Sequence, residues 1–208
     1  MPKEGSMTML HIHRLLLVAG ICAAIVQFPE TAFAHVEGEA ISGFFSGLSH
    51  PVSGWDHILA MIAVGLWGAL LGPPALWILP IAFPIAMAAG GMLGLLGIPL
   101  PWVEIGIAAS SIVLGLFIVT NMRLSLAVAI PLVMIFALFH GHAHGTELSS
   151  GADAVLYSMG FVIATGLLHA FGIGIGAVDR LPMGRTVLRA LGGGVLLGGT
   201  YFLIGAFA

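Results

Sequence analysis

The sequence is poor in charged residues: Lys, Arg, Asp and Glu make up 7% of its 208 residues. A soluble domain carries roughly 25% charged residues, because its surface must be hydrated. Six Lys and Arg residues make no basic surface, which excludes a nucleic-acid partner. One cysteine excludes a disulfide scaffold. With 59% hydrophobic residues, the remaining class is an all-α, polytopic helix bundle in a lipid bilayer.

The first 34 residues have the three parts of a secretory signal peptide. Lys3 and Arg14 precede an apolar stretch at 15–26, and Ala32 and Ala34 supply the small residues that signal peptidase reads. We expect 1–34 to be a cleavable signal peptide, with an uncleaved membrane helix as the alternative. Cleavage leaves 35–208 as one domain. Its first residue, His35, offers both an α-amine and an imidazole to a metal ion.

Six apolar segments follow, each near the ~20 residues that a helix needs to cross a bilayer. They lie at 54–71, 75–97, 102–120, 124–140, 152–177 and 186–207. We therefore expect six transmembrane helices in the mature chain. Proline inside a span kinks the helix or frees a backbone carbonyl, as predicted for Pro80, Pro84 and Pro131.

The thirty glycines indicate tight contacts between these helices. Two small residues spaced by four positions let helix backbones approach closely. Four glycine pairs have this spacing, and we expect each to lie at a helix contact: Gly68/Gly72, Gly90/Gly94, Gly172/Gly176 and Gly194/Gly198.

The orientation follows from the arginines, since positive charges collect on the cytoplasmic side. The four arginines after residue 34 lie in or beside the loops 121–123 and 178–185; they are Arg123, Arg180, Arg185 and Arg189. Most carboxylates fall on the other side, namely Glu37, Glu39, Asp56, Glu104, Glu147 and Asp153. The sequence thus predicts a multi-pass membrane protein whose mature N-terminus lies outside and whose acidic outer face attracts cations.

Nine histidines outnumber the lysines and arginines, and most belong to two clusters. The first cluster comprises His50, Asp56 and His57, with Met61 one helical turn later. Pro51 and Gly54 predict a turn before the helix, and Asp56 falls in the first helical turn, where a carboxylate is favoured. Met61 is either a further ligand or a packing residue.

The second cluster closes the fourth span. If the helix continues through it, His140, His144 and Glu147 lie on one stripe at i, i+4 and i+7. His142 then points elsewhere, and we expect it to be a solvated loop residue. Glu104 opens the third span near the same face, either as a helix-dipole partner or as a member of the site.

Together, the two clusters predict a metal site of His50, Asp56, His57, His140, His144 and Glu147, since helix pairs often present such ligands inward. Imidazole with carboxylate suits Zn, Ni, Co, Cu or Fe, and ligand type alone does not choose among them. His169 differs, because it lies past the bilayer midplane. It is either a structural hydrogen-bonding group or a relay between the outer face and the cytoplasm.

At these residues the sequence resembles the HupE/UreJ family of small nickel or cobalt permeases. The first motif matches at His50, Pro51, Gly54, Asp56, His57 and Met61, and the second at Phe139, His140, Gly141, Ala143, His144, Gly145 and Glu147. A weaker similarity surrounds His169. The resemblance implies a protein of the bacterial inner membrane with its mature N-terminus in the periplasm. It further implies uptake of Ni²⁺, or Co²⁺, which supplies hydrogenase or urease maturation.

The predicted mechanism is capture of a divalent transition metal ion at the outer face, followed by relay inward without ATP hydrolysis by this chain. Imidazoles bind metal only when neutral, so uptake should fall below pH ~6.5. An intramembrane metal-dependent hydrolase using the same ligands is one alternative, and a metal sensor or metallochaperone scaffold is another. The sequence is also compatible with a homo-oligomer.

Overall fold

Every regular element of the computed structural model is a helix, in the residues that it describes (39–148 and 154–207). The predicted signal peptide and His35 lie outside these residues. In chain order the elements are α2 (Glu39–Ser49), η2 (His50–Val52), α3 (Trp55–Leu71), α4 (Ala75–Leu95), α5 (Val103–Thr120), α6 (Leu126–Glu147), α7 (Ala154–Gly176), η3 (Ala177–Arg180) and α8 (Gly184–Gly205). The all-α fold class is confirmed.

Five continuous helices are long and apolar enough to cross a membrane: α4, α5, α6, α7 with η3, and α8. The predicted first span is different, because α3 has only 17 residues and joins the preceding helical segment at an angle of 78°. The break lies where the sequence predicts a turn. Pro51 has no amide proton to continue a helix, and Gly54 is extended at φ −107° and ψ 121°. The described residues therefore contain five helices that could span a membrane, and six if the bent pair crosses it as one span.

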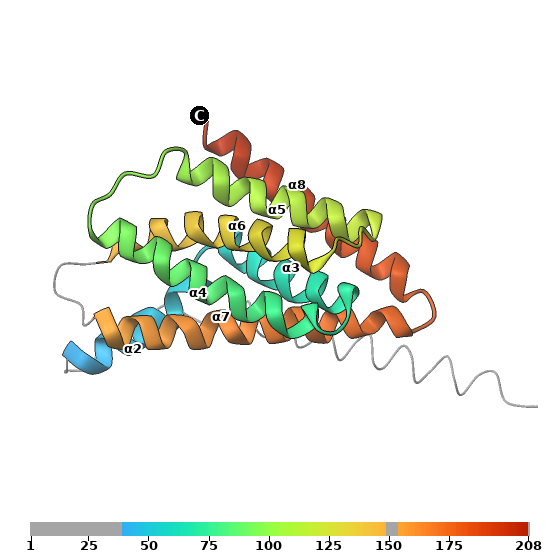
Figure 1. Cartoon of the computed structure of the whole chain (residues 1–208), viewed down its shortest axis with the longest axis horizontal. Coiled ribbons are helices and arrows are strands. Elements are labelled where there is room, and N and C mark those ends of the chain that lie inside the picture. Colours follow the sequence, from blue (N-terminus) through green and yellow to red (C-terminus); the bar gives the residue numbers. More distant parts are fainter. Residues whose placement is uncertain (1–38, 149–153, 208) are drawn as a thin grey trace, which may run out of the picture. The chain divides into compact units, whose positions relative to one another are not determined.

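The helices pack side by side (Figure 1). Glycines make the closest contacts between them. A Cβ atom on Gly90 of α4 would overlap the backbone oxygen of Leu138 on α6, and one on Gly65 of α3 would overlap that of His169 on α7. Gly176 lies against Ala69 further along the second pair, so α3 and α7 run in the same direction. The glycine contacts predicted at Gly90/Gly94 and Gly172/Gly176 are confirmed.

The contact predicted at Gly194 is wrong. A Cβ atom there would meet nothing within 4 Å, whereas Gly192 and Gly199 of the same helix lie against α5. The buried face of α8 is set by Leu188 and Val195, and Gly194 lies on the opposite, exposed side. Gly72 is a helix terminator rather than a packing residue, since its φ of 78° is the left-handed conformation that glycine tolerates.

The end of the bundle that bears the arginines is closed by polar contacts between elements. The indole N–H of Trp67, near the end of α3, donates to the carbonyl of Met122 at 3.0 Å. Asp179 in η3 pairs with Arg185 at the start of α8, with 3.5 Å between Oδ1 and Nε. Because α3 runs toward this end and α6 runs away from it, the first residues of α3 and the last of α6 meet at the opposite end.

Candidate metal centre

The bend before α3 places His50 and His57 on the same side of the bundle. His50 begins the 3-10 turn, where the Ser53 hydroxyl donates to its carbonyl at 2.7 Å. Asp56 Oδ1 accepts from the backbone N–H of His57 and lies 2.9 Å from the Nδ1 atom of the same residue. A carboxylate acceptor assigns the ring proton to Nδ1, which leaves the Nε2 lone pair of His57 free.

The fourth predicted span continues as a helix through Glu147, so the expected stripe of His140, His144 and Glu147 forms. Glycines alternate with the histidines and let α6 lie directly on α4. A Cβ atom on Gly141 would overlap the backbone oxygen of Met87, and one on Gly145 would overlap that of Gly91. The backbone contact with α4 thereby fixes the direction in which the stripe projects.

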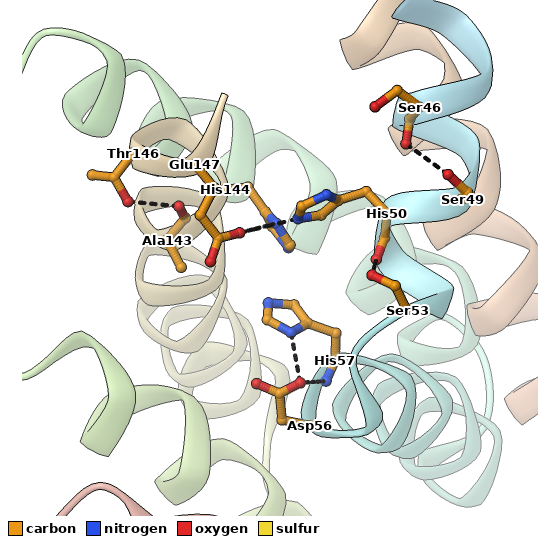
Figure 2. Close-up of polar contacts among 10 residues, drawn as sticks. All are labelled: Ser46, Ser49, His50, Ser53, Asp56, His57, Ala143, His144, Thr146 and Glu147. Carbon is orange, nitrogen blue, oxygen red and sulfur yellow. Dashed lines mark hydrogen bonds and ion pairs between the residues drawn. The ribbon is translucent and has the colours of Figure 1, made fainter. Parts of the chain in front are cut away.

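His50, His144 and Glu147 converge at the outer end of the site (Figure 2). One ligand atom from each lies within 4.8 Å of the others. Glu147 Oε2 is 3.0 Å from His50 Nε2 and 3.7 Å from His144 Nδ1. This group of two imidazoles and one carboxylate, drawn from two different elements, has the composition and spacing of a transition-metal site.

The imidazole rings continue inward from this group as a row, in the order His50, His144, His57 and His140. The ring centroids are 4.7 Å apart for His50 and His144, 4.3 Å for His144 and His57, and 4.7 Å for His57 and His140. The first members are the exposed ones, with side-chain exposures of 57% at Glu147 and 29% at His50, whereas His144 and His57 are nearly buried at 7% and 10%. His140, at the inner end, is 0% exposed.

The innermost ring is held by a serine that the sequence reasoning missed. The Ser110 hydroxyl donates to the carbonyl of Ile107 at 2.6 Å, and its oxygen lies 3.0 Å from His140 Nε2. Because the Ser110 hydroxyl already donates its proton to Ile107, the His140 ring donates to the Ser110 oxygen through Nε2. The Nδ1 lone pair of His140 is then free. A Ser-Ser pair inside an apolar span was the available signal, because polar groups in spans are costly and often functional.

Four buried ring nitrogens of the row have no hydrogen-bond partner among the described residues. They are His57 Nε2, His140 Nδ1 and both ring nitrogens of His144. Buried polar atoms without partners are rare, since each costs about 1–3 kcal/mol. Unpaired imidazole lone pairs arranged along a line are what a transition-metal ion binds. Asp56, by contrast, uses its Oδ1 atom to orient His57.

Three other residues considered in the sequence analysis lie outside the row. His142 is buried on α6, and its Nε2 lies 2.8 Å from the carbonyl of Ile98, so the expectation of a solvated loop residue is wrong. The helix continues past it, and the loop after α4 covers it. Met61 is fully buried in the apolar core. Glu104 is exposed in the first turn of α5.

His169 lies on α7, apart from the row but linked to it by an aromatic ring. The Phe83 ring has its centroid 5.7 Å from that of His140 and 5.4 Å from that of His169. On the outer side, Tyr157 and Phe161 of α7 contact His50 and His144, with centroids 5.8 Å and 4.4 Å apart respectively. Sequence reasoning did not identify these three aromatic residues.

Comparison with known proteins gives a consistent result over most of the chain. A family model described as HupE / UreJ protein matches residues 23–202. Protein HupE of Rhizobium leguminosarum bv. viciae is 47% identical over 182 residues, which cover 88% of this chain and 95% of that protein. No solved structure matches the chain.

Proposed function

Since this chain belongs to the HupE/UreJ family, a family of nickel and cobalt transporters, we propose that it takes up Ni²⁺ across the bacterial inner membrane through the His/carboxylate row. The family assigns metal transport and not catalysis, so the intramembrane hydrolase is set aside. The family is also linked to the nickel metabolism of hydrogenase and urease, and we propose that the imported ion supplies the maturation of one of them.

The decrease in exposure along the row carries this proposal. A hydrated cation meets the exposed carboxylate of Glu147 and the half-buried His50 first. His144 and His57 then offer free nitrogens at nearly buried positions, and His140 offers one at a fully buried position. Neighbouring rings are close enough for the ion to exchange one imidazole for the next while it sheds water. Binding is thereby divided over several weak sites, which permits inward release.

The arrangement also explains how the ligands keep the correct nitrogen available. Asp56 holds the Nδ1 proton of His57, and Ser110 accepts the Nε2 proton of His140. Hydrogen bonds to the far side of a ligating imidazole fix its tautomer and ring orientation. We therefore assign Asp56 an orienting role beside the ligands His50, His57, His140, His144 and Glu147.

Transport by the purified protein tests the proposal. In liposomes containing the full chain, we expect ⁶³Ni²⁺ to accumulate without nucleotide. Co²⁺ should compete because it also favours nitrogen ligands, whereas excess Mg²⁺ should not, because it prefers oxygen. Protein-free liposomes serve as the control. Tight Ni²⁺ binding without flux would instead support the sensor or metallochaperone scaffold.

The proposed orientation of the bundle in the membrane makes a separate prediction. Cys22 is the single cysteine, so single cysteines can be placed in a Cys22→Ser background. Val52 lies at the histidine end and Met183 at the arginine end, and both side chains are exposed. In spheroplasts, a membrane-impermeant maleimide should label Val52→Cys, while Met183→Cys should react only after the membrane is disrupted. The reverse pattern would place the row on the cytoplasmic side.

A further inference from the structure

We propose that Thr165 and His169 of α7, together with the carbonyl oxygen of Pro80 on α4, form a second, deeper site for the transported divalent cation. This inference rests on the proposed function, because it supplies the inward half of the same pathway. The deeper site shares no residue with the row of His50, His57, His140, His144 and Glu147, which we call the outer row.

The first observation is the unmet bonding capacity of two buried side chains. His169 is 1% exposed and Thr165 is 0% exposed. Neither ring nitrogen of His169 nor the hydroxyl of Thr165 has a hydrogen-bond partner within the described residues. The two residues are four positions apart on α7, so they lie on one side of the helix, one turn from each other. The acceptor beside its ring is the backbone carbonyl of Pro80 on α4, which can take one ring proton and leaves the other ring nitrogen free.

The second observation is a backbone acceptor supplied by proline. In an α-helix the carbonyl of residue 80 would accept from the amide of residue 84. Residue 84 is Pro84, which has no amide proton, so the carbonyl of Pro80 lacks its usual partner inside α4. The backbone of Pro80 lies beside the ring of His169. An imidazole and a backbone carbonyl therefore lie together between α4 and α7, and the Thr165 hydroxyl lies one helical turn away on α7.

The third observation is the position of this group. His169 lies against Gly65 of α3, eight residues after His57, and so about 12 Å further from the outer end at 1.5 Å per residue. Seven residues, or about 10 Å, separate it from the end of α7 at Gly176. The Phe83 ring contacts both His140 and His169. The group is therefore the next polar position inward from the row.

The chemistry of the donors fits a transit site. One nitrogen and two neutral oxygens cannot complete the coordination of a divalent transition metal, so the ion would keep part of its water. Such a set binds more weakly than several imidazoles and lacks a carboxylate that would retain the cation. A weaker site beyond a stronger one allows release toward the cytoplasm.

The test separates capture from transit by measuring both on the same full-length variants. His169→Ala and Thr165→Val remove one donor each, and His169→Gln restores an oxygen donor. Ser111→Ala is the matched control, because Ser111 is also a buried, unpartnered hydroxyl but lies against α8. Equilibrium binding of ⁶³Ni²⁺ to protein in detergent reports capture, and uptake into liposomes reports transit.

We expect His169→Ala to lower uptake at least about tenfold and Thr165→Val by several fold, with the Ni²⁺ Kd of the outer row unchanged. His169→Gln should recover part of the uptake, and Ser111→Ala should behave as the parent. Parental uptake in both His169 variants would overturn the inner site. A loss of Ni²⁺ binding equal to the loss of uptake would also overturn it, because His169 would then act through the outer row.

The same series keeps this inference distinct from the proposed function. If His169→Ala does not fold, Thr165→Val and His169→Gln decide the question. Failure of the inner site alone leaves His57→Ala and His144→Ala defective in uptake. Failure of the proposed function leaves those outer variants transporting at the parental rate.

Discussion

Replacing either His57 or His144 by alanine is expected to lower Ni²⁺ uptake by about a hundredfold, the largest effect of any single substitution in the chain. Both rings lie in the middle of the row, and each contacts two other imidazoles. Losing either ring removes a buried ligand and opens a gap between its neighbours, so that the ion has no adjacent nitrogen to move to. Initial rates of ⁶³Ni²⁺ uptake, normalised to protein in the membrane, measure the effect.

His142→Gln is the matched control for these variants. His142 belongs to the same helix and is also buried, but it bonds the Ile98 carbonyl and stands outside the row. Glutamine keeps a donor for that carbonyl, so uptake should stay within about twofold of the parent. Parental uptake in both His57→Ala and His144→Ala would remove the basis for the row as the transport pathway.

Adding one methyl group at Gly141 or Gly145 is expected to be nearly as damaging, through the fold rather than through the ligands. A Cβ atom at either position would overlap the backbone of α4. A backbone cannot move aside as a flexible side chain can, so α6 must shift away from α4 and carry His140 and His144 with it. Overpacking of this kind typically costs about 1–3 kcal/mol.

Thermal unfolding of purified Gly141→Ala and Gly145→Ala measures the loss of stability, and uptake per folded molecule measures the displacement of the histidines. Gly166→Ala and Gly174→Ala on α7 are the controls, since a Cβ atom at either site meets nothing within 4 Å. Unchanged melting temperatures in the two α6 variants would show that α4 and α6 do not depend on these close contacts.

The composition of the candidate site was predictable from the sequence because ionisable residues are scarce in membrane spans. The spacing of His140, His144 and Glu147 predicted the stripe, and the structure confirms that α6 continues through it. Pro51 and Gly54 predicted the break before α3, since one lacks an amide proton and the other ends the helix in an extended conformation.

The face that each helix turns toward its neighbours was less predictable from the sequence, as Gly194 and His142 show. In a soluble bundle the polar face of a helix marks its exposed side, but lipid and protein core are equally apolar, so a membrane helix carries little such signal. Gly194 was therefore predicted to lie at a helix contact, although Gly192 faces α5 and Gly194 does not. His142 lies under the loop after α4, a contact between distant residues that local spacing does not encode.

The distribution of carboxylates has a consequence for which ions enter. In the part of the chain that the structure describes, the acids lie near the two ends of the bundle, with Glu147 and Asp56 at one and Asp179 at the other. Two negative charges at the outer row balance a divalent ion, whereas a monovalent ion leaves the loaded site with excess charge in a medium of low dielectric constant. Beyond His140 the ion meets only neutral dipoles, so the Born energy is highest in the middle of the bundle. On the proposed pathway the carboxylates would therefore select an ion by its valence, and the imidazoles would select it by its affinity for nitrogen.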